Sequence, residues 1–377
     1  MLFDNTKIGF ELKTDFELKK AYFLFKVISS RYLTSFGKKI LNVSLKLNLP
    51  VSYIIRKTVF SQFCSGLNLE DSMNTVEKLF SKNVYSYLHY SVEASQNEKS
   101  FNDSCDNVIE SIEFASINDN IPFTVFKPTA LGKTSDFMKS NNNQNIYDRI
   151  DKICKKAYEK KVKVLVDAEE SWIQDSIDNL VEMMMKKYNK VNPIVFNTVQ
   201  MYRHDRLNYL KKMLESANQN DFKIGVKLVR GAYIEKENDR AKKLNYESPI
   251  CKSKEETDMN FNNAVQFILS NLDTFNLFCG THNEESLYKI IDIIESRGLK
   301  RGYEKIWFGQ LLGMSDHITF NMASQKYNVV KYLPYGPIKK VMPYLIRRAE
   351  ENTSVKGQTS RELTLIKNEI IRRKKLN

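Results

Sequence analysis

Two adjacent arginines with a glutamate just after them suggest binding chemistry more directly than any other residues of this chain. Arg347 and Arg348 lie in the segment YLPYGPIKKVMPYLIRRAEEN, and Glu351 follows them within one helical turn. Adjacent helical residues differ in direction by about 100°, so both arginines can flank one groove within reach of Glu351. Guanidinium groups bind carboxylates through paired hydrogen bonds. The pattern indicates either a carboxylate clamp braced by Glu351 or a surface helix with ordinary ion pairs, and Pro343 marks where that helix starts or bends.

The elements that must position such a clamp come from a regular alternation along the chain. Short β-branched or aromatic runs alternate with amphipathic segments, such as the one that places Ile173, Ile177 and Leu180 on one helical face. Alternating strands and helices predict parallel pairing through right-handed crossovers. The runs lie at 84–93, 123–127, 162–168, 194–202, 223–233, 275–282, 305–313 and 328–336.

The number of runs decides between two architectures. An open dinucleotide-binding sheet normally carries G-x-G-x-x-G after its first strand, and the glycines of this chain form neither that pattern nor a P-loop. Eight strands over this span favour a closed (β/α)8 barrel of the TIM type. We expect residues 1–80 to form an N-terminal helical layer and residues 81–377 to form the barrel with a C-terminal helix. The patch KSNNNQN at 139–145 is expected to be a solvated loop.

Composition excludes several protein classes. The 377 residues are 42% hydrophobic and 27% charged, which is typical of a folded, water-soluble chain, and the net charge of +13 favours acidic partners. Five scattered cysteines, none in C-x-x-C spacing, argue against a disulfide framework or a thiolate metal site, so no metal is expected. We find no signal peptide and no apolar run long enough to span a membrane, and we expect a cytoplasmic protein.

Polar residues close most of the apolar runs. Taken singly, each is better explained as a local salt bridge or cap, but the carboxyl ends of barrel strands meet at one face, where active sites form. Convergence there favours an active site. The residues are Lys127, Asp167, Glu169, Gln200, Tyr202, Arg230, Tyr233, His282, Asn283, Gln310, Tyr332 and Tyr335.

Several motifs in register give this chain a family resemblance. The segment around the arginine pair, together with KLVRGAY (227–233), FGQLLGMSD (308–316), VDAEE (166–170), THN (281–283) and FKPTALG (126–132), resembles proline dehydrogenase. The motifs fall in the family's order and extend from about residue 85 to 355, over the whole expected barrel. The resemblance implies an FAD-dependent (β/α)8 barrel that oxidises L-proline to Δ1-pyrroline-5-carboxylate, in proline catabolism, and passes electrons to a membrane quinone.

The resemblance also implies roles for matched residues. It assigns the proline carboxylate to Arg347, Arg348 and Lys127, with Glu351 supporting the arginines. Tyr332 is expected to pack over the proline ring, with Tyr233 and Leu311 as further walls, and Asp167 to lie near both flavin and substrate. The flavin contacts that it implies are Asp167, Gln200, Lys227, Gly231, Ala232, Lys254, Thr281, His282, Asn283 and Arg348.

The chain departs from the family pattern at three places. Lys227 stands where some members have an arginine near the flavin N1, so only the positive charge carries over. Ile234 replaces an aromatic residue, and KSK (252–254) is the only counterpart of a T-R-K motif for the cofactor phosphates, which makes Lys254 the least secure assignment.

Two alternative functions and one further hypothesis, on membrane contact, stay open at this point. Another flavin barrel, acting on a folate or a different secondary amine, would not be reduced by L-proline. A basic nucleic-acid or lipid-binding protein would bind in a strongly salt-dependent way and carry no flavin, and we expect no nucleic-acid partner. The basic N-terminal layer and the tail at 363–375 suggest peripheral contact with the inner face of a membrane, although the tail is better explained as the last packed helix.

Overall fold

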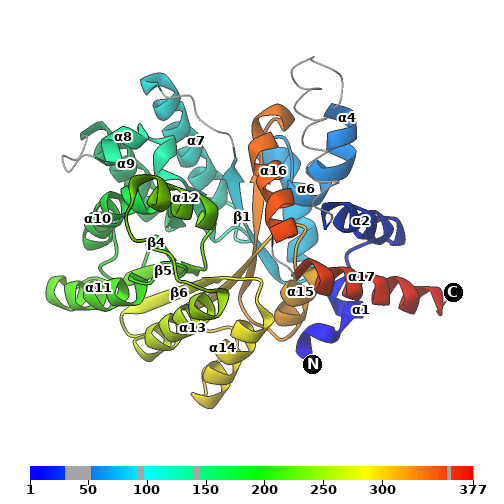
Figure 1. The fold of residues 1–377 in the computed structure, drawn as a ribbon. Coiled ribbons are helices and arrows are strands. Elements are labelled where there is room, and N and C mark those ends of the chain that lie inside the picture. The colour runs from blue at the N-terminus through cyan, green and yellow to red at the C-terminus, as the bar shows by residue number, and fades with distance from the viewer. Residues whose placement is uncertain (30–51, 92–96, 139–143, 355–357, 377) are drawn as a thin grey trace. The chain divides into compact units, whose positions relative to one another are not determined.

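The expected fold class is confirmed. The computed structural model describes residues 1–29, 52–91, 97–138, 144–354 and 358–376, and its eight strands form one closed parallel barrel in chain order (Figure 1). The strands are β1 (Val84–Tyr90), β2 (Phe123–Phe126), β3 (Lys163–Val166), β4 (Val195–Gln200), β5 (Ile224–Val229), β6 (Phe275–Gly280), β7 (Ile306–Leu311) and β8 (Val329–Tyr335).

Helices alternate with these strands as the sequence predicts. Those before β1 are η1 (Leu2–Asp4), α1 (Thr6–Gly9), α2 (Asp15–Ile28), α4 (Ser52–Ile55), the π-helical turn η2 (Arg56–Phe60), α5 (Ser61–Phe63) and α6 (Leu69–Phe80). Between the strands lie α7 (Glu98–Ser116), η3 (Pro128–Ala130), α8 (Thr134–Phe137), α9 (Gln144–Lys160), α10 (Ser171–Tyr188), α11 (Arg206–Asn220), α12 (Ile234–Leu244), α13 (Lys254–Ser270), α14 (Glu284–Ser296) and α15 (Asp316–Ser324). After β8 come α16 (Ile338–Ser354) and α17 (Gln358–Lys374).

The strands form in short runs dominated by β-branched, aliphatic and aromatic residues, without strict alternation of polar and apolar positions. All six residues of β4 and all seven of β8 are buried. Parallel strands covered on both faces require such runs, which is why these segments are recognisable in the sequence. The strands are shorter than the predicted runs because the polar residues at the run ends belong to the loops. The described parts of residues 1–80 are helical, whereas 30–51 and most of the KSNNNQN patch lie outside the described residues.

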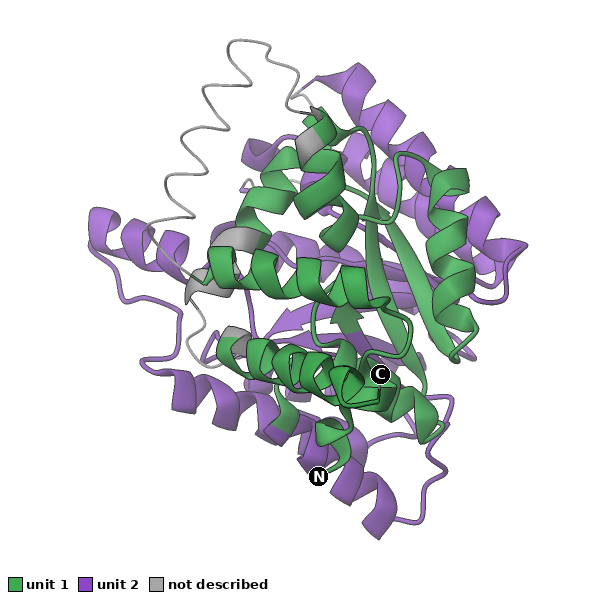
Figure 2. Ribbon diagram, turned by 90° about the vertical axis from the view of Figure 1, so that its right-hand side faces the viewer, with its two compact units in different colours: residues 1–93, 282–284, 310–377 green, residues 94–281, 285–309 purple. Residues whose placement is uncertain are grey.

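Two compact units divide the chain (Figure 2). Unit 1 comprises residues 1–93, 282–284 and 310–377, and unit 2 comprises residues 94–281 and 285–309. Each is described by itself below.

In unit 2, aromatic rings fill the space between the amino ends of the strands. Phe123, the first residue of β2, makes edge-to-face contacts with Phe196, Phe278 and Trp307 at 5.8, 5.1 and 5.1 Å between ring centroids. The Lys163 ammonium lies 5.2 Å from the Phe123 and Trp307 rings, and burial lowers its pKa. Edge-to-face pairs of this kind stabilise a core beyond their buried area. Aromatic side chains therefore fill the amino ends of β2, β4, β6 and β7, and an active site is expected at the carboxyl ends of the strands.

In unit 1, β1 pairs with β8, and the last helix α17 packs against α2 and α1. Leu365 and Ile366 of α17 are buried, while Leu363 and Ile370 are half-buried. The prediction that the tail is a packed helix is thus confirmed. Among the described residues, no helix has the length and apolarity needed to cross a membrane.

Candidate active site

The carboxyl ends of β2 to β5 bring the first group of predicted residues into unit 2. Lys127 directly follows β2, and its ammonium donates a hydrogen bond to the hydroxyl of Tyr233 at 3.3 Å. Tyr233 is the residue before α12, and burial raises the pKa of its hydroxyl despite the nearby ammonium of Lys127. The sequence predicted both residues for the substrate pocket, and the structure places them in contact.

Asp167 and Lys227 form an ion pair that the sequence does not reveal. The Lys227 ammonium lies 2.6 Å from Oδ1 of Asp167, and the two side chains are 10% and 18% exposed. Asp167 follows β3 and Lys227 lies within β5. These two strands are the neighbours of β4 on either side, and their side chains meet across it. The cation expected near the flavin is therefore partly neutralised by a carboxylate that is itself a predicted site residue.

Gln200 is oriented by the loop after β3. This last residue of β4 donates from its amide nitrogen to the backbone carbonyl of Glu169 at 2.7 Å. The Glu169 carboxylate in turn accepts hydrogen bonds from the backbone N–H and hydroxyl of Thr129, at 2.9 and 2.6 Å. Glu169 is 4% exposed, and burial raises its pKa although Lys127 and Thr129 oppose the shift. A glutamine held through its nitrogen presents its oxygen as an acceptor.

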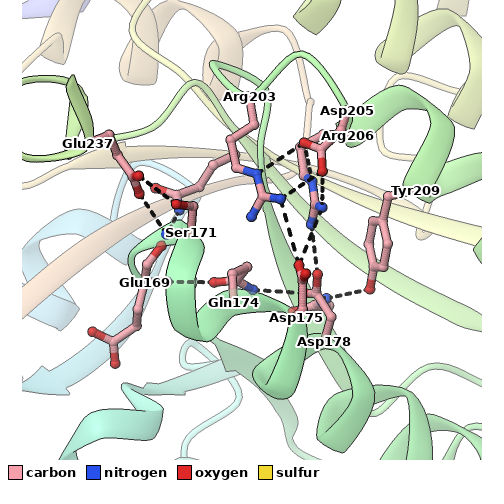
Figure 3. A network of polar contacts seen from close by, with 12 residues as sticks. Glu169, Ser171, Gln174, Asp175, Asp178, Arg203, Asp205, Arg206, Tyr209 and Glu237 are labelled. Carbon is pink, nitrogen blue, oxygen red and sulfur yellow. Dashed lines mark hydrogen bonds and ion pairs between the residues drawn. The ribbon is translucent and has the colours of Figure 1, made fainter. Parts of the chain in front are cut away.

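A network of polar side chains centred on Gln174, Asp178 and Arg206 holds the loop after β3 in place (Figure 3). Gln174 of α10 accepts from the backbone N–H of Glu169 at 2.7 Å and donates to Asp178 at 2.8 Å. Asp178 also forms an ion pair with Arg206, 2.7 Å away, whose guanidinium binds Asp205 as well. A carboxylate this deeply buried is tolerated because each of its oxygens is hydrogen-bonded. The network ties the loop after β3 to the start of α11.

Gly231 lets the backbone pack directly against the ring of Tyr202, which a residue with a side chain could not do. Its φ is +130°, and a Cβ there would lie 2.5 Å from the ring of Tyr202. Both facts require glycine at this position. Ala232, the other residue predicted for close backbone approach, is exposed.

Arg230 connects Lys254 and Thr281, two further residues predicted to contact the flavin. Its guanidinium donates to Asp258 at 2.6 Å and to the hydroxyl of Thr281 at 2.8 Å. Lys254, the first residue of α13, pairs with the same Asp258 at 2.6 Å, and its side chain is 64% exposed. The structure therefore links Lys254 and Thr281 through Arg230 and Asp258, a link that the sequence pattern does not show.

In unit 1, helix α16 carries the arginine pair and runs without interruption through Pro343. Arg347 and Arg348 are both half-buried, and the Arg348 guanidinium lies 5.4 Å from the centroid of the Tyr344 ring. The helix begins directly after Pro337, so Pro343 neither starts nor ends it. The side chain of Glu351 lies outside the described residues, and its predicted bracing role stays a prediction.

Tyr332 connects the arginine helix to β1. Its ring packs against Tyr344 at 6.0 Å and against Tyr87 at 5.2 Å. Its hydroxyl makes a short hydrogen bond with Nδ1 of His89 and lies 3.3 Å from the hydroxyl of Ser91. Sequence reasoning predicted Tyr332 but missed these partners, although His89 and Ser91 close the first strand run just as the predicted residues close theirs.

The remaining predicted residues of unit 1 lie at the ends of β6 and β7. His282 contacts the hydroxyl of Ser315 through Nδ1 at 2.9 Å, and Asn283 is half-buried. Leu311, the last residue of β7, is half-buried, and its carbonyl accepts from the buried Lys331 ammonium at 3.1 Å. Within the described residues, no group of histidine, cysteine or acidic side chains could hold a metal ion.

Comparisons with known proteins agree with this architecture. The family model described as proline dehydrogenase matches residues 72–361. The mitochondrial proline dehydrogenase 1 of Dictyostelium discoideum is 30% identical over 96% of this chain and 73% of its own length. The carbapenem antibiotics biosynthesis protein CarD of Pectobacterium carotovorum is 35% identical over 84% of each chain. The hydroxyproline dehydrogenase of Xenopus laevis is 28% identical over 97% of this chain and 88% of its own.

Solved structures show the same fold. Proline utilization A of Bdellovibrio bacteriovorus superposes with a TM-score of 0.75 at 20% identity over 93% of this chain, which spans 38% of that longer protein. The family match runs from α6 to the start of α17 and so includes every barrel strand and both arginines. From this match and the two relatives at 30% identity or more, we conclude that the chain belongs to the proline dehydrogenase family and is an oxidoreductase.

Proposed function

We propose that this chain oxidises L-proline to Δ1-pyrroline-5-carboxylate, with FAD as the bound hydride acceptor and a quinone as the final electron acceptor. The observation that carries the proposal is the half-buried arginine pair on α16, in which Arg348 lies over the ring of Tyr344 and Tyr344 packs on Tyr332. Proline is a zwitterion, so its site needs fixed cations for the carboxylate. Bidentate guanidinium groups beside aromatic rings suit a carboxylate attached to an apolar ring.

The side chains present fit a flavin. The positive φ of Gly231 and its close packing on the ring of Tyr202 fix the backbone between β5 and Tyr233, the segment expected to approach the flavin. Gln200, held through its amide nitrogen, offers an oxygen acceptor that suits the imide N–H of a flavin ring. A bound flavin would supply the hydride acceptor that no amino-acid side chain provides. The residues proposed to hold it are Asp167, Gln200, Lys227, Gly231, Ala232, Lys254, Thr281, His282, Asn283 and Arg348.

The chain's own residues would orient the substrate. In the proposal Arg347, Arg348 and Lys127 bind the carboxylate, Glu351 braces the arginines, and Tyr332, Tyr233 and Leu311 form the pocket walls. The C5–H bond of proline breaks as hydride, the amine nitrogen gives up a proton, and the C5=N double bond forms. Overall, the hydride and the proton removed from proline amount to two electrons and two protons, which reduce the quinone to a quinol. Position, charge and exclusion of water are the protein's contributions.

The test is reduction of the bound flavin by L-proline without oxygen, followed by reoxidation with a soluble quinone analogue. We expect the yellow colour to disappear with L-proline and to return with the quinone. Because one similar protein is a hydroxyproline dehydrogenase, trans-4-hydroxy-L-proline belongs in the same experiment as a second candidate substrate. A flavin that is bleached by another secondary amine but not by L-proline would replace the proposed substrate.

We also propose peripheral contact with an anionic membrane, where a quinone would be found. Phe16 and Phe23 are 76% and 69% exposed on α2, and Lys19 and Lys26 are exposed on the same helical face. Exposed aromatic rings interleaved with lysines are typical of helices that lie at a lipid surface. This face therefore supports the peripheral contact that the net charge first suggested.

Vesicle flotation tests the membrane contact. The chain should float with anionic vesicles at low salt, and replacing both Phe16 and Phe23 with serine should reduce the bound fraction several-fold, because their apolar area drives insertion. Ile117→Ser, at a residue 80% exposed after α7, is the matched control. Failure of the unaltered protein to float at low salt would rule out the contact.

A further inference from the structure

The first turn of α10 is capped by a carboxylate from another helix. Ser171, the first residue of α10, donates its backbone N–H to Oε1 and its hydroxyl to Oε2 of Glu237, both at 2.6 Å. Glu237 is fully buried in α12, and the residue before α10, Glu170, makes no side-chain cap of its own. Free N–H groups at a helix start are usually satisfied by a nearby Ser, Thr, Asp or Asn. Here the cap comes from a residue 66 positions away in the sequence.

Three contacts hold the beginning of α12 against the beginning of α10. Besides Glu237, Lys236 forms an ion pair with Glu170, and the Arg240 guanidinium lies 4.4 Å from the ring of Trp172. Tyr233 immediately precedes α12, and its carbonyl accepts the backbone N–H of Glu237 at 2.9 Å. The short segment that carries Tyr233 is therefore fixed at one end by β5 and at the other by Glu237.

The Glu237 cap also completes a triangle of loop contacts. Thr129 binds Glu169, which joins the loops after β2 and β3. Ser171 binds Glu237, which joins the first turns of the helices that follow β3 and β5 (Figure 3). Lys127 binds Tyr233, which joins the loops after β5 and β2. Each loop is thus braced by both of the others, and a triangle resists deformation in a way that two contacts alone do not.

We propose that Glu237 is a positioning residue for proline binding. By holding α12 on α10, it fixes Tyr233 and, through the hydroxyl of Tyr233, the ammonium of Lys127. The inference rests on the proposed function, in which Lys127 and Tyr233 contact the substrate. Glu237 itself touches neither substrate nor flavin in this account, so its effect is expected on proline affinity and not on the intrinsic rate of hydride transfer.

The experiment compares Glu237→Gln with Glu235→Gln. Both variants remove one negative charge from the first turn of α12, but Glu235 is exposed and makes no contact with Ser171. A glutamine can keep both contacts, since the Ser171 hydroxyl can accept from the amide nitrogen, but neutral hydrogen bonds then replace the stronger ones to a carboxylate. Anaerobic rapid mixing gives the apparent dissociation constant for L-proline and the limiting rate of flavin reduction separately. We expect that constant to rise about tenfold in Glu237→Gln, with full flavin content and a limiting rate within about threefold, and no change in Glu235→Gln.

A combination with Tyr233→Phe shows whether Glu237 acts through Tyr233. If it does, the double variant should bind proline no worse than Tyr233→Phe alone, because neighbouring residues in one chain of contacts are not additive. Ser171→Ala, which removes only the hydroxyl donor, should show a smaller rise of about threefold and keeps the inference testable if Glu237→Gln does not fold.

An unchanged proline constant in Glu237→Gln, or in Ser171→Ala if the first variant does not fold, would overturn the inference. So would an additive effect with Tyr233→Phe, which would assign Glu237 a purely structural role. These outcomes differ from failure of the proposed function, in which the unaltered protein itself is not reduced by L-proline and the inference falls with it.

Discussion

At the scale of single residues, the structure changes the interpretation of the arginine pair. In the sequence alone, Arg347 and Arg348 are better explained by a surface helix with ordinary ion pairs. In the structure both are half-buried, and Arg348 lies over the ring of Tyr344, which itself packs on Tyr332. A guanidinium group held over an aromatic face loses little freedom when it binds a carboxylate, because its plane is already set. This supports its proposed role as a carboxylate clamp.

Replacing one arginine tests the clamp. In Arg348→Met with Arg347 intact, we expect the KM for L-proline to rise about 10- to 100-fold, because hydrogen bonds to charged groups contribute about 1.5 to 3 kcal/mol. Although Arg348 is also among the residues proposed to hold the flavin, we expect the flavin to be retained, because the other nine proposed contacts are unaltered. Steady-state kinetics with a quinone analogue measure the effect, and Lys340→Met removes the same charge from an exposed position of α16 as a control. An unchanged KM in Arg348→Met would refute the carboxylate role.

Residue identities could be predicted from motifs, but their partners could not. Lys127, Asp167 and Tyr233 each end an apolar run, so their place near the barrel mouth follows from the fold class. Lys227 and Asp167 are 60 positions apart, and nothing in the sequence pairs them. The same holds for Glu237 and Ser171. Such contacts depend on which side chains face each other across a third strand or between two helices, and that information is not local.

At the scale of elements, the strands were the easiest part to predict. A parallel barrel strand is buried on both faces, so its residues form short continuous apolar runs with polar ends. Each of the eight predicted runs contains one strand of the barrel. Helix α16 was harder, because Pro343 in its sequence argued for a break. The helix continues because a proline in the second turn removes only one intrahelical hydrogen bond, and the packed residues Val341, Met342, Tyr344 and Leu345 hold both sides of it.

Helix α17 is anchored by a buried carboxylate. Burial alone would raise the pKa of Glu369, but hydrogen bonds from Arg372 and Arg373 lower it to about 2. Arg373 in addition donates to the backbone carbonyls of Lys13 and Phe10, which tie α17 to the N-terminal segment. Since the pKa of an unfolded glutamate is about 4.3, this carboxylate stabilises the folded state above that pH and loses its contribution as pH falls toward 2.

Glu369→Gln should therefore have a pH-dependent cost. At neutral pH we expect the free energy of unfolding to fall by about 2 kcal/mol, because the three charge-assisted hydrogen bonds from Arg372 and Arg373 weaken. The difference from the unaltered protein should shrink steadily as pH decreases from about 5 to about 2. Urea unfolding at several pH values measures this. Glu285→Gln, in an exposed ion pair with Lys289, should change stability by less than about 0.5 kcal/mol at any pH, and a Glu369→Gln effect that is independent of pH would contradict the explanation.

At the scale of the whole molecule, the chain's two ends belong to one compact unit. Unit 1 contains residues 1–93 together with 310–377, so the helices that precede β1 and those that follow β8 share one core. Contacts such as Arg361 with Asp4 and Arg373 with Asp15 join segments more than 350 positions apart. Sequence periodicity identifies each helix but not such pairings, because periodicity reports which face is buried and not what covers it. The boundary at residue 80 remains a prediction.

The fold class followed from the sequence because a repeated local pattern has few global solutions. Eight alternations of strand and helix, without a nucleotide-binding glycine motif, leave the closed barrel as the main architecture. The substrate did not follow in the same way. The substrate was inferred from the family resemblance. The match to the family model then showed that the chain is an oxidoreductase of the proline dehydrogenase family. The central proposal is that L-proline binds at the arginine pair and is oxidised by FAD held by the residues proposed above.

Anaerobic titration of the purified, flavin-loaded protein with L-proline tests that proposal most directly. We expect the visible absorbance of the oxidised flavin to fall in proportion to added L-proline, to reach its end point near one proline per flavin, and to return when a quinone analogue is added. A chain that binds FAD but keeps its full absorbance in excess L-proline would contradict the account.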